Sequence, residues 1–86
     1  MKNRSRQDII ASMLKNSKEE CSRSHLMHLA ILTHRELLEY LGYLQRHKLI
    51  EIDEDTRHVH TTKKGNTWLT IYKELVAMTE EIGVKT

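Results

Sequence analysis

The stretch THRELLEYLGYLQRHKLI, residues 33–50, carries the strongest structural signal in this chain. Leu37, Leu41 and Leu44 follow a spacing of four and three residues, which places all three on one face of a helix. Thr33 and Glu36 match the S/T-x-x-E capping box, in which each side chain accepts a hydrogen bond from the backbone N–H of the other. We therefore expect a helix that begins directly after Thr33 and ends near residues 47–48.

The residues that follow, LIEIDEDTRHVHTT (49–62), predict a two-stranded hairpin. Ile50 and Ile52 fall on one face of the first strand, because side chains alternate between the two faces of a strand. The turn covers residues 53–56, and Val59 points inward from the returning strand. A helix that leads directly into a hairpin is typical of a winged helix-turn-helix. The hairpin is either a DNA-contacting wing or a cover for the core, and the sequence leaves both readings open.

Two shorter helices precede this stretch. Ser5 and Asp8 nearly match a capping box, so we expect a first helix from Ser5 to a point just before the polar connector 18–22. That connector is a candidate third strand beside the hairpin. Ser24 is the expected cap of a second helix that reaches Ile31. Two capped helices joined by a turn of about three residues have the spacing of a helix-turn-helix.

The last helix is expected to begin after Thr61 or Thr62 and to run to about Ile82, before Gly83, a length of about 30 Å at 1.5 Å per residue. Its apolar residues cover an arc too wide for one small domain to bury. The side that we expect to close the chain's own core comprises Trp68, Leu69, Tyr72 and Val76. The side that we expect to form a heptad seam with a second copy comprises Trp68, Ile71, Leu75, Met78 and Ile82. The alternative is one broad face packed wholly within the monomer.

Together these elements predict a mainly α fold with a small β-hairpin, a winged helix-turn-helix with a long C-terminal helix. Residues 1–62 form the winged helix-turn-helix, with the wing at about 49–62, and residues 63–86 form the C-terminal core and dimerisation helix of the same single domain. A chain of 86 residues has room for one small core. No apolar run approaches the roughly 20 residues that span a membrane, and no signal peptide is recognisable. A single cysteine, Cys21, fits a cytoplasmic protein.

At this point the sequence resembles the small archaeal winged-helix proteins of the type found in Sulfolobus, which bind DNA and pair through an antiparallel coiled coil of C-terminal helices. The resemblance covers Ser5 to about Leu75. It is carried by SRQDIIASML, Ser24-His-Leu-Met, Leu32-Thr33, Leu37, Tyr40-Leu41, Leu49-Ile50-Glu51, Thr62-Lys-Lys-Gly65, Trp68-Leu69 and Tyr72. It implies a winged-helix fold, a homodimer and double-stranded DNA as the partner.

Several positions depart from the pattern of this family. Relatives usually carry basic residues at the positions of His25 and Leu29, and Lys-Arg at those of Leu38 and Glu39. These changes remove expected phosphate contacts, although Glu39 could accept a hydrogen bond from a cytosine amino group. Lys48 stands where relatives have Gly, so the turn after the third helix is expected to differ. The formal net charge of +2 is also mild for a nucleic-acid binder.

We expect the third helix to enter the major groove with its N-terminus first, where His34 and Arg35 are the main candidates for base or phosphate contact. Thr33 either contacts phosphate or serves only as the cap. The candidate DNA-binding residues are Arg23, Thr33, His34, Arg35, Tyr43, Arg57 and His58, with a phosphate-contacting arm of Lys2, Arg4 and Arg6. For each basic residue, a solvated surface position is the alternative.

The function that these features favour is a dimeric DNA-binding protein, either a transcriptional regulator or a nucleoid-associated protein. The alternative is a winged-helix module that binds another protein through its third helix. Leu38 discriminates between them, since exposure beside Glu39 favours a protein partner and burial favours DNA. No catalytic motif or phosphate-binding loop is present, which argues against an enzyme. Cys21, His25 and His28 lack a familiar metal-ligand spacing, so no metal or cofactor is predicted, and no small-molecule effector can be inferred.

Overall fold

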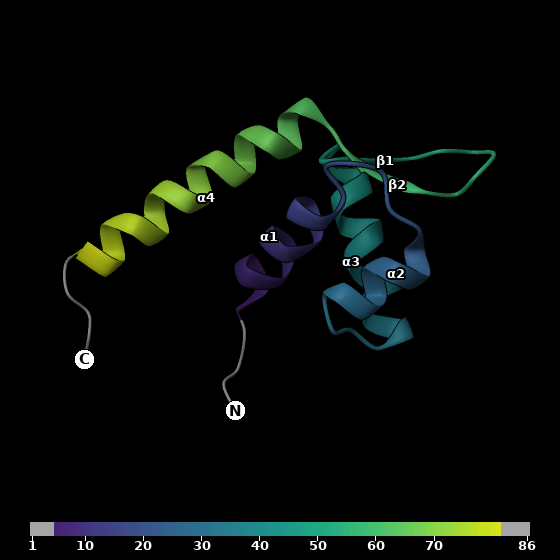
Figure 1. Cartoon of the computed structure of the whole chain (residues 1–86), viewed down its shortest axis with the longest axis horizontal. Coiled ribbons are helices and arrows are strands. Elements are labelled where there is room, and N and C mark those ends of the chain that lie inside the picture. The colour runs from purple at the N-terminus through teal and green to yellow at the C-terminus, as the bar shows by residue number, and fades with distance from the viewer. Residues whose placement is uncertain (1–4, 82–86) are drawn as a thin grey trace.

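The computed structural model describes residues 5–81, with side chains up to Thr79. Its elements in chain order are α1 (Arg6–Asn16), α2 (Arg23–Leu29), α3 (His34–Arg46), β1 (Ile50–Ile52), β2 (Val59–Thr61) and α4 (Lys63–Glu81). Figure 1 shows α1, α2 and α3 grouped together, with the hairpin projecting from one end of the group and α4 running past α1 and away from it. This is the predicted mainly α fold with a β-hairpin and a long C-terminal helix.

The starts of α1 and α3 are set by the two capping boxes that the sequence predicts. In α1, the Ser5 hydroxyl accepts a hydrogen bond from the Asp8 backbone N–H at 3.0 Å, and the Asp8 carboxylate accepts one from the Ser5 N–H at 3.3 Å. In α3, the corresponding distances between Thr33 and Glu36 are 3.1 and 2.9 Å. Each box satisfies two backbone N–H groups that otherwise lack partners within the helix.

The predicted bounds of α2 are wrong at both ends. Ser22, not Ser24, is the cap, because its hydroxyl accepts a hydrogen bond from the His25 N–H at 3.1 Å. The helix ends at Leu29, because Ile31 has left the helical conformation and adopts a φ of 54°. Arg23 is therefore the first residue of α2, one residue before the predicted cap Ser24.

Two helices end in the left-handed conformation that usually favours glycine. Ile31 follows α2 with a φ of 54°, and Lys48 follows α3 with a φ of 58°. After α3, the Leu49 N–H donates to the Leu44 carbonyl at 2.8 Å, which is the hydrogen bond of a Schellman motif. Lys48 thus makes the type of helix ending that glycine usually makes.

The hairpin and the connector form a small sheet. β1 and β2 are antiparallel, with Ile50 opposite Thr61 and Ile52 opposite Val59. Cys21 joins them through an isolated bridge to Val59, with N–H···O distances of 2.9 and 2.8 Å, as the third-strand prediction for the connector anticipated. Val59 is fully buried, so its predicted inward direction is confirmed.

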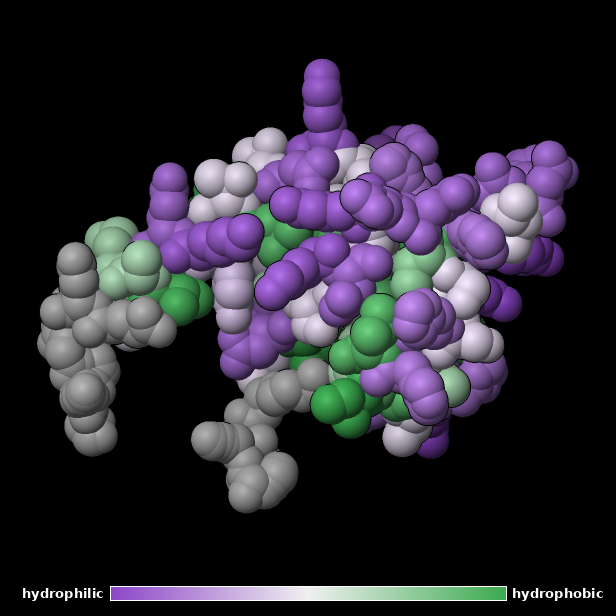
Figure 2. All heavy atoms as spheres, in the orientation of Figure 1, coloured by the Kyte–Doolittle hydropathy of each residue, from purple (hydrophilic) through white to green (hydrophobic). Residues whose placement is uncertain are grey.

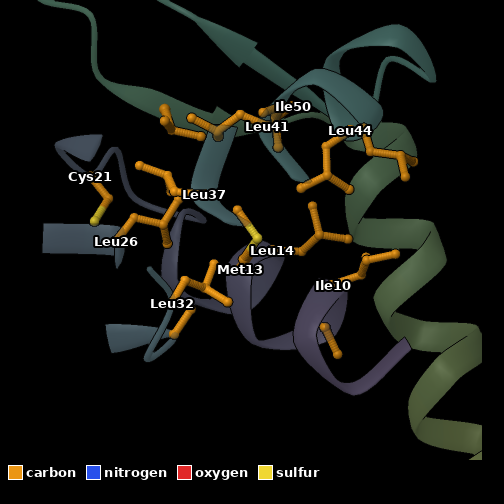
Figure 3. Packing of buried hydrophobic residues seen from close by; sticks show 14 of the residues in the cluster. Ile10, Met13, Leu14, Cys21, Leu26, Leu32, Leu37, Leu41, Leu44 and Ile50 are labelled. Carbon is orange, nitrogen blue, oxygen red and sulfur yellow. The ribbon is translucent and has the colours of Figure 1, made fainter. Parts of the chain in front are cut away.

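The core lies between α1, α2, α3 and the base of the hairpin. Figure 3 shows Leu37, Leu41 and Leu44 of α3 turned inward, toward Met13 and Leu14 of α1. The predicted leucine face of α3 is thus the face that packs against α1. The larger buried side chains of the core are Ile10, Met13, Leu14, Leu26, Leu32, Leu37, Leu41, Leu44, Leu49, Ile50, Val59 and Leu69.

The first half of α4 completes this core. Thr62 is its cap, with the hydroxyl accepting from the Gly65 N–H at 3.0 Å. Leu69 is buried, and Trp68 and Tyr72 pack partly buried against the core. Val76 was expected on the same side, but it is 36% exposed, so its assignment to the core is wrong.

The second half of α4 extends away from the rest of the molecule (Figure 1). Apart from half-buried Tyr72, every side chain described from Ile71 to Thr79 is exposed. Ile82 and Gly83, where the sequence predicts that the helix ends, lie outside the described residues. Within residues 5–81, no helix combines the length and the apolar character needed to cross a membrane.

Candidate nucleic-acid interface

The outward face of α3 is defined by the leucines on its other side. Because those leucines point into the core, the residues about half a turn away must point outward. These residues recur at spacings of four, three and four, and each of them is exposed: Arg35, Glu39, Gly42 and Arg46. We call these four residues the α3 stripe. It carries two guanidinium groups, one carboxylate and one position with no side chain.

The N-terminal end of α3 lies at the start of the stripe. His34 and Arg35 are its first two residues, and both are exposed. Thr33 is exposed as well, but its hydroxyl oxygen already accepts the capping hydrogen bond from Glu36. The capping role expected for Thr33 is therefore present. The capping box fixes the direction in which His34 and Arg35 leave the helix end.

Two predicted basic residues lie on one hollow beside the C-terminal half of α3. Arg23, partly buried at the start of α2, and Arg57, exposed in the hairpin loop, border the same hollow of about 450 Å³. Arg57 has a φ of 67°, so the hairpin backbone turns sharply at this residue. The hollow is lined by Arg23, Gln45, Ile52, Asp53, Glu54 and Arg57. The structure thus brings α2, α3 and the wing together along one side of the stripe.

Acidic groups at the tip of the wing oppose this positive charge. The Asp53 carboxylate accepts hydrogen bonds from the backbone N–H groups of Asp55 at 2.8 Å and Thr56 at 2.9 Å. The hydrogen bonds from Thr56 and then Asp55 lower the pKa of the Asp53 carboxyl. The carboxylate is therefore charged at neutral pH and holds the turn in shape. A wing with this tip repels phosphate except where Arg57 lies.

Two other predicted contact residues are less accessible than the stripe. Tyr43 is half-buried and packs against the core, with its ring centroid 4.5 Å from that of His47. It lies on the flank of α3, beside the outward face that carries the stripe. His58 is half-buried in the hairpin, next to the exposed Arg57.

The N-terminal arm is described only at Arg6. This residue begins α1, and its guanidinium carbon lies 5.9 Å from the centroid of the Tyr40 ring. Arg6 borders a small hollow together with Glu36 and Glu39, on the flank of α3. Lys2 and Arg4 lie outside the described residues.

Sequence reasoning missed Gly42 and Arg46 of the stripe, whereas the distribution of basic residues along the chain predicts Lys63 and Lys64 on a DNA-facing surface. Arg46 was not selected, although extending the spacing from Arg35 through Glu39 would have reached it. Lys48, Lys63 and Lys64 line a hollow of about 640 Å³ between the end of α3, β1 and the start of α4. The Lys64 ammonium donates to the His47 carbonyl at 3.0 Å, so part of this charge serves to hold the two helices together.

Leu38, the residue that discriminates between DNA binding and protein binding, is exposed. Leu38 is 46% exposed, and Glu39 beside it is exposed too. Figure 2 shows hydrophilic side chains over most of the viewed face, interrupted by smaller hydrophobic areas. By the criterion stated above, the exposure of Leu38 favours a protein partner. An apolar side chain in a major groove can also contact the methyl group of thymine.

The cysteine and the histidines do not assemble into a recognisable site. Within residues 5–81, no group of three or more His, Cys, Asp or Glu side chains is placed to hold a metal ion. Cys21 is a free, buried thiol, and burial raises its pKa. A buried thiol with a raised pKa is a weak nucleophile and a poor metal ligand in its protonated form.

Comparisons with known proteins agree with the fold. The model of a family described as winged helix-turn-helix matches residues 3–80. The fold is similar to the crystal structure of Sso10a-2, a DNA-binding protein from Sulfolobus solfataricus, with a TM-score of 0.79 over 92% of this chain and 85% of that chain. The two sequences are 21% identical, so the likeness concerns the fold. The search of curated proteins gave no match.

Proposed function

Because the chain belongs to the winged helix-turn-helix family, we propose that it binds double-stranded DNA by inserting α3 into the major groove. The observation that carries the proposal is the α3 stripe, which begins at a firmly capped helix end and faces away from the core. Sso10a-2, which shares the fold, is described as a DNA-binding protein. Neither the family model nor the solved structure indicates an enzyme.

The geometry supports a division of roles among the basic residues. Arg35, in the first turn of α3, is placed to reach base edges, where a guanidinium can bond a guanine through two hydrogen bonds. His34 next to it is placed to contact a base or a phosphate. Arg23 and Arg57 border the hollow beside α3 and are proposed to hold the backbone phosphates on that side. Lys2, Arg4 and Arg6 are proposed to follow the backbone from the N-terminus.

The protein is further proposed to act as a homodimer through α4. Ile71 is 53%, Leu75 57% and Met78 60% exposed, and they recur at the spacing of a heptad seam. Trp68, the first residue of the predicted seam, instead packs partly against the chain's own core and stacks on Tyr72 at a centroid distance of 5.5 Å. Ile82 lies outside the described residues. A dimer would present two α3 helices to one duplex, and we propose that it acts as a transcriptional regulator or a nucleoid-associated protein.

The second candidate function is a winged-helix module that binds a protein through α3. The exposure of Leu38 beside Glu39 supports it, because a leucine and a carboxylate are unusual on a surface that faces phosphates. The two functions predict different effects of salt. DNA binding weakens steeply as salt rises, with a slope in log–log form of about −0.9 per phosphate contact. An apolar contact with a protein has a much weaker dependence.

Fluorescence anisotropy with a random-sequence duplex across a salt series tests the proposal. The wild type should bind at low salt, and Arg35→Ala should weaken binding by about tenfold, as the loss of a bidentate base or phosphate contact implies. Lys73→Ala, which removes an exposed cation from α4, is the matched control and should leave binding unchanged. Absence of wild-type binding at low salt would defeat the DNA proposal and leave the protein-binding module.

A further inference from the structure

Gly42 occupies a position where a helix gains nothing from glycine. It lies in the middle of α3, between His34 and Arg46, with helical backbone geometry. After proline, glycine is the least favourable residue inside a helix, because it loses the most backbone freedom when the helix forms. A glycine at such a position therefore calls for a physical reason, either within the fold or outside it.

Packing within the chain does not provide that reason. A Cβ atom built on Gly42 would meet nothing within 4 Å. Gly65 shows the contrasting case, because a Cβ there would lie 2.3 Å from the Leu49 carbonyl oxygen. Gly65 is required by the close approach of α4 to the chain before β1. Gly42 has open space over it, so within the described residues its fold would accept alanine and larger side chains.

The open space lies over the proposed interface. The inward direction of Leu37, Leu41 and Leu44 in Figure 3 places Gly42 on the opposite side of α3. Along the α3 stripe, Gly42 lies two turns after Arg35 and one turn before Arg46. The one position of the stripe without a side chain thus lies between its two guanidinium groups, with the carboxylate of Glu39 about one turn before it.

The dimensions of the major groove make the size of the side chain at position 42 important for DNA binding. The groove is about 12 Å wide, and an α-helix with its side chains is about 10–12 Å across. A helix in the groove therefore fits with little clearance, and the size of the side chain that faces the bases sets how deeply it can enter. Removing that side chain lets the backbone approach the base edges more closely.

We propose that Gly42 is the point of closest approach between α3 and DNA, and that it is a positioning residue for the guanidinium groups on either side. The inference rests on the proposed DNA binding. It adds the requirement that position 42 has no side chain, which DNA binding alone does not impose. With no side chain at position 42, α3 lies deep enough for Arg35 to reach base edges and for Arg46 to reach the flanking phosphates. A larger residue there lifts the helix and withdraws both contacts.

Substitution of Gly42 by Ala and by Leu tests this inference on the full chain. Gly42→Ala should raise Tm by about 4 °C, because alanine favours the helix. It should also weaken binding to a random-sequence duplex by about tenfold, and Gly42→Leu should weaken it further. Ala77→Leu adds a bulky side chain to an exposed position of α4 and should leave DNA binding unchanged.

The outcomes separate the two proposals. If the wild type binds the duplex and Gly42→Ala binds equally well or better, the role of Gly42 is overturned while DNA binding stands. A lower Tm for Gly42→Ala would show that the fold itself requires the glycine, which also overturns the inference. If the wild type binds no duplex at low salt, both proposals fail. A variant that is more stable and binds less supports the inference, since loss of structure cannot produce that combination.

Discussion

Lys48 ends α3 in a backbone conformation that lysine rarely adopts. Its φ of 58° places the Cβ close to the following carbonyl, at a cost of about 1–2 kcal/mol. Glycine avoids that repulsion but loses more conformational freedom on folding. We predict that Lys48→Gly raises the free energy of unfolding by about 0.5–1 kcal/mol, measured by urea denaturation.

The control for this prediction is Lys48→Ala. It removes the ammonium but keeps the Cβ, so the strain and the stability should stay near those of the wild type. A Lys48→Gly variant that is less stable than the wild type would contradict the prediction, because the strain at residue 48 would then cost less than the conformational freedom that glycine loses on folding. The same substitution at Ile31, whose φ is 54°, should act in the same direction.

At the scale of single residues, the sequence predicts those helix caps whose two partners are close neighbours in the chain. Thr33 and Glu36 form their capping box as predicted, because both partners lie within one turn of helix. Ser22 was missed in favour of Ser24, since the choice depends on Cys21, whose backbone pairs with Val59 far along the chain. That pairing fixes where the connector ends and is invisible to local reasoning.

At the scale of elements, one side-chain hydrogen bond joins the start of α1 to α4. The Tyr72 hydroxyl donates to the Asp8 carboxylate, which also completes the cap of α1. Tyr72→Phe should lower the free energy of unfolding by about 1 kcal/mol, measured by urea denaturation near neutral pH. Tyr40→Phe, which removes a hydroxyl from α3 instead, is the control and should have a smaller effect.

The contribution of the hydrogen bond between Tyr72 and Asp8 to stability should also depend on pH. The hydrogen bond to Asp8, followed by partial burial, raises the pKa of Tyr72 above its usual value near 10. A raised folded-state pKa means that the contribution to stability is fully present below the unfolded pKa and is lost as pH rises through the folded pKa. The difference between wild type and Tyr72→Phe should therefore shrink above about pH 10. A difference that is constant into strongly alkaline buffer would contradict this role of Tyr72.

The spacing of apolar residues predicts the buried face of α3 better than that of α4. The leucine face of α3 is narrow, and the structure buries it as predicted. The apolar arc of α4 is wide, so spacing alone could not divide it between the chain's own core and a partner. Trp68 packs against the core and Val76 does not, because α4 leaves the body of the protein after Tyr72. The direction of a helix relative to the core is a tertiary property.

At the scale of the whole molecule, the exposed side of α4 predicts an oligomer. We expect the wild type to sediment as a dimer, and Met78→Glu to sediment as a monomer, because two carboxylates would be buried at the seam. Lys73→Glu changes an exposed residue outside the seam and is the control. A dimer that persists in Met78→Glu would refute the seam, and a monomeric wild type would refute dimerisation through α4.

The assembly of the interface is the part that the sequence predicts least. His34 and Arg35 could be selected because they follow a predicted cap. Arg23 and Arg57 border one hollow beside α3 although they are far apart in the sequence, and this placement becomes visible only in three dimensions. The partial burial of Tyr43 depends in the same way on tertiary packing, because its ring packs against the core.

An NMR titration with a short duplex shows directly whether the α3 stripe faces the DNA. Backbone amide shifts should change most at His34, Arg35 and Gly42, with smaller changes at Arg23 and Arg57 and little change along α4. The claim is contradicted if the duplex saturates the protein while the amides of the α3 stripe keep their positions, or if the changes gather on α4 instead.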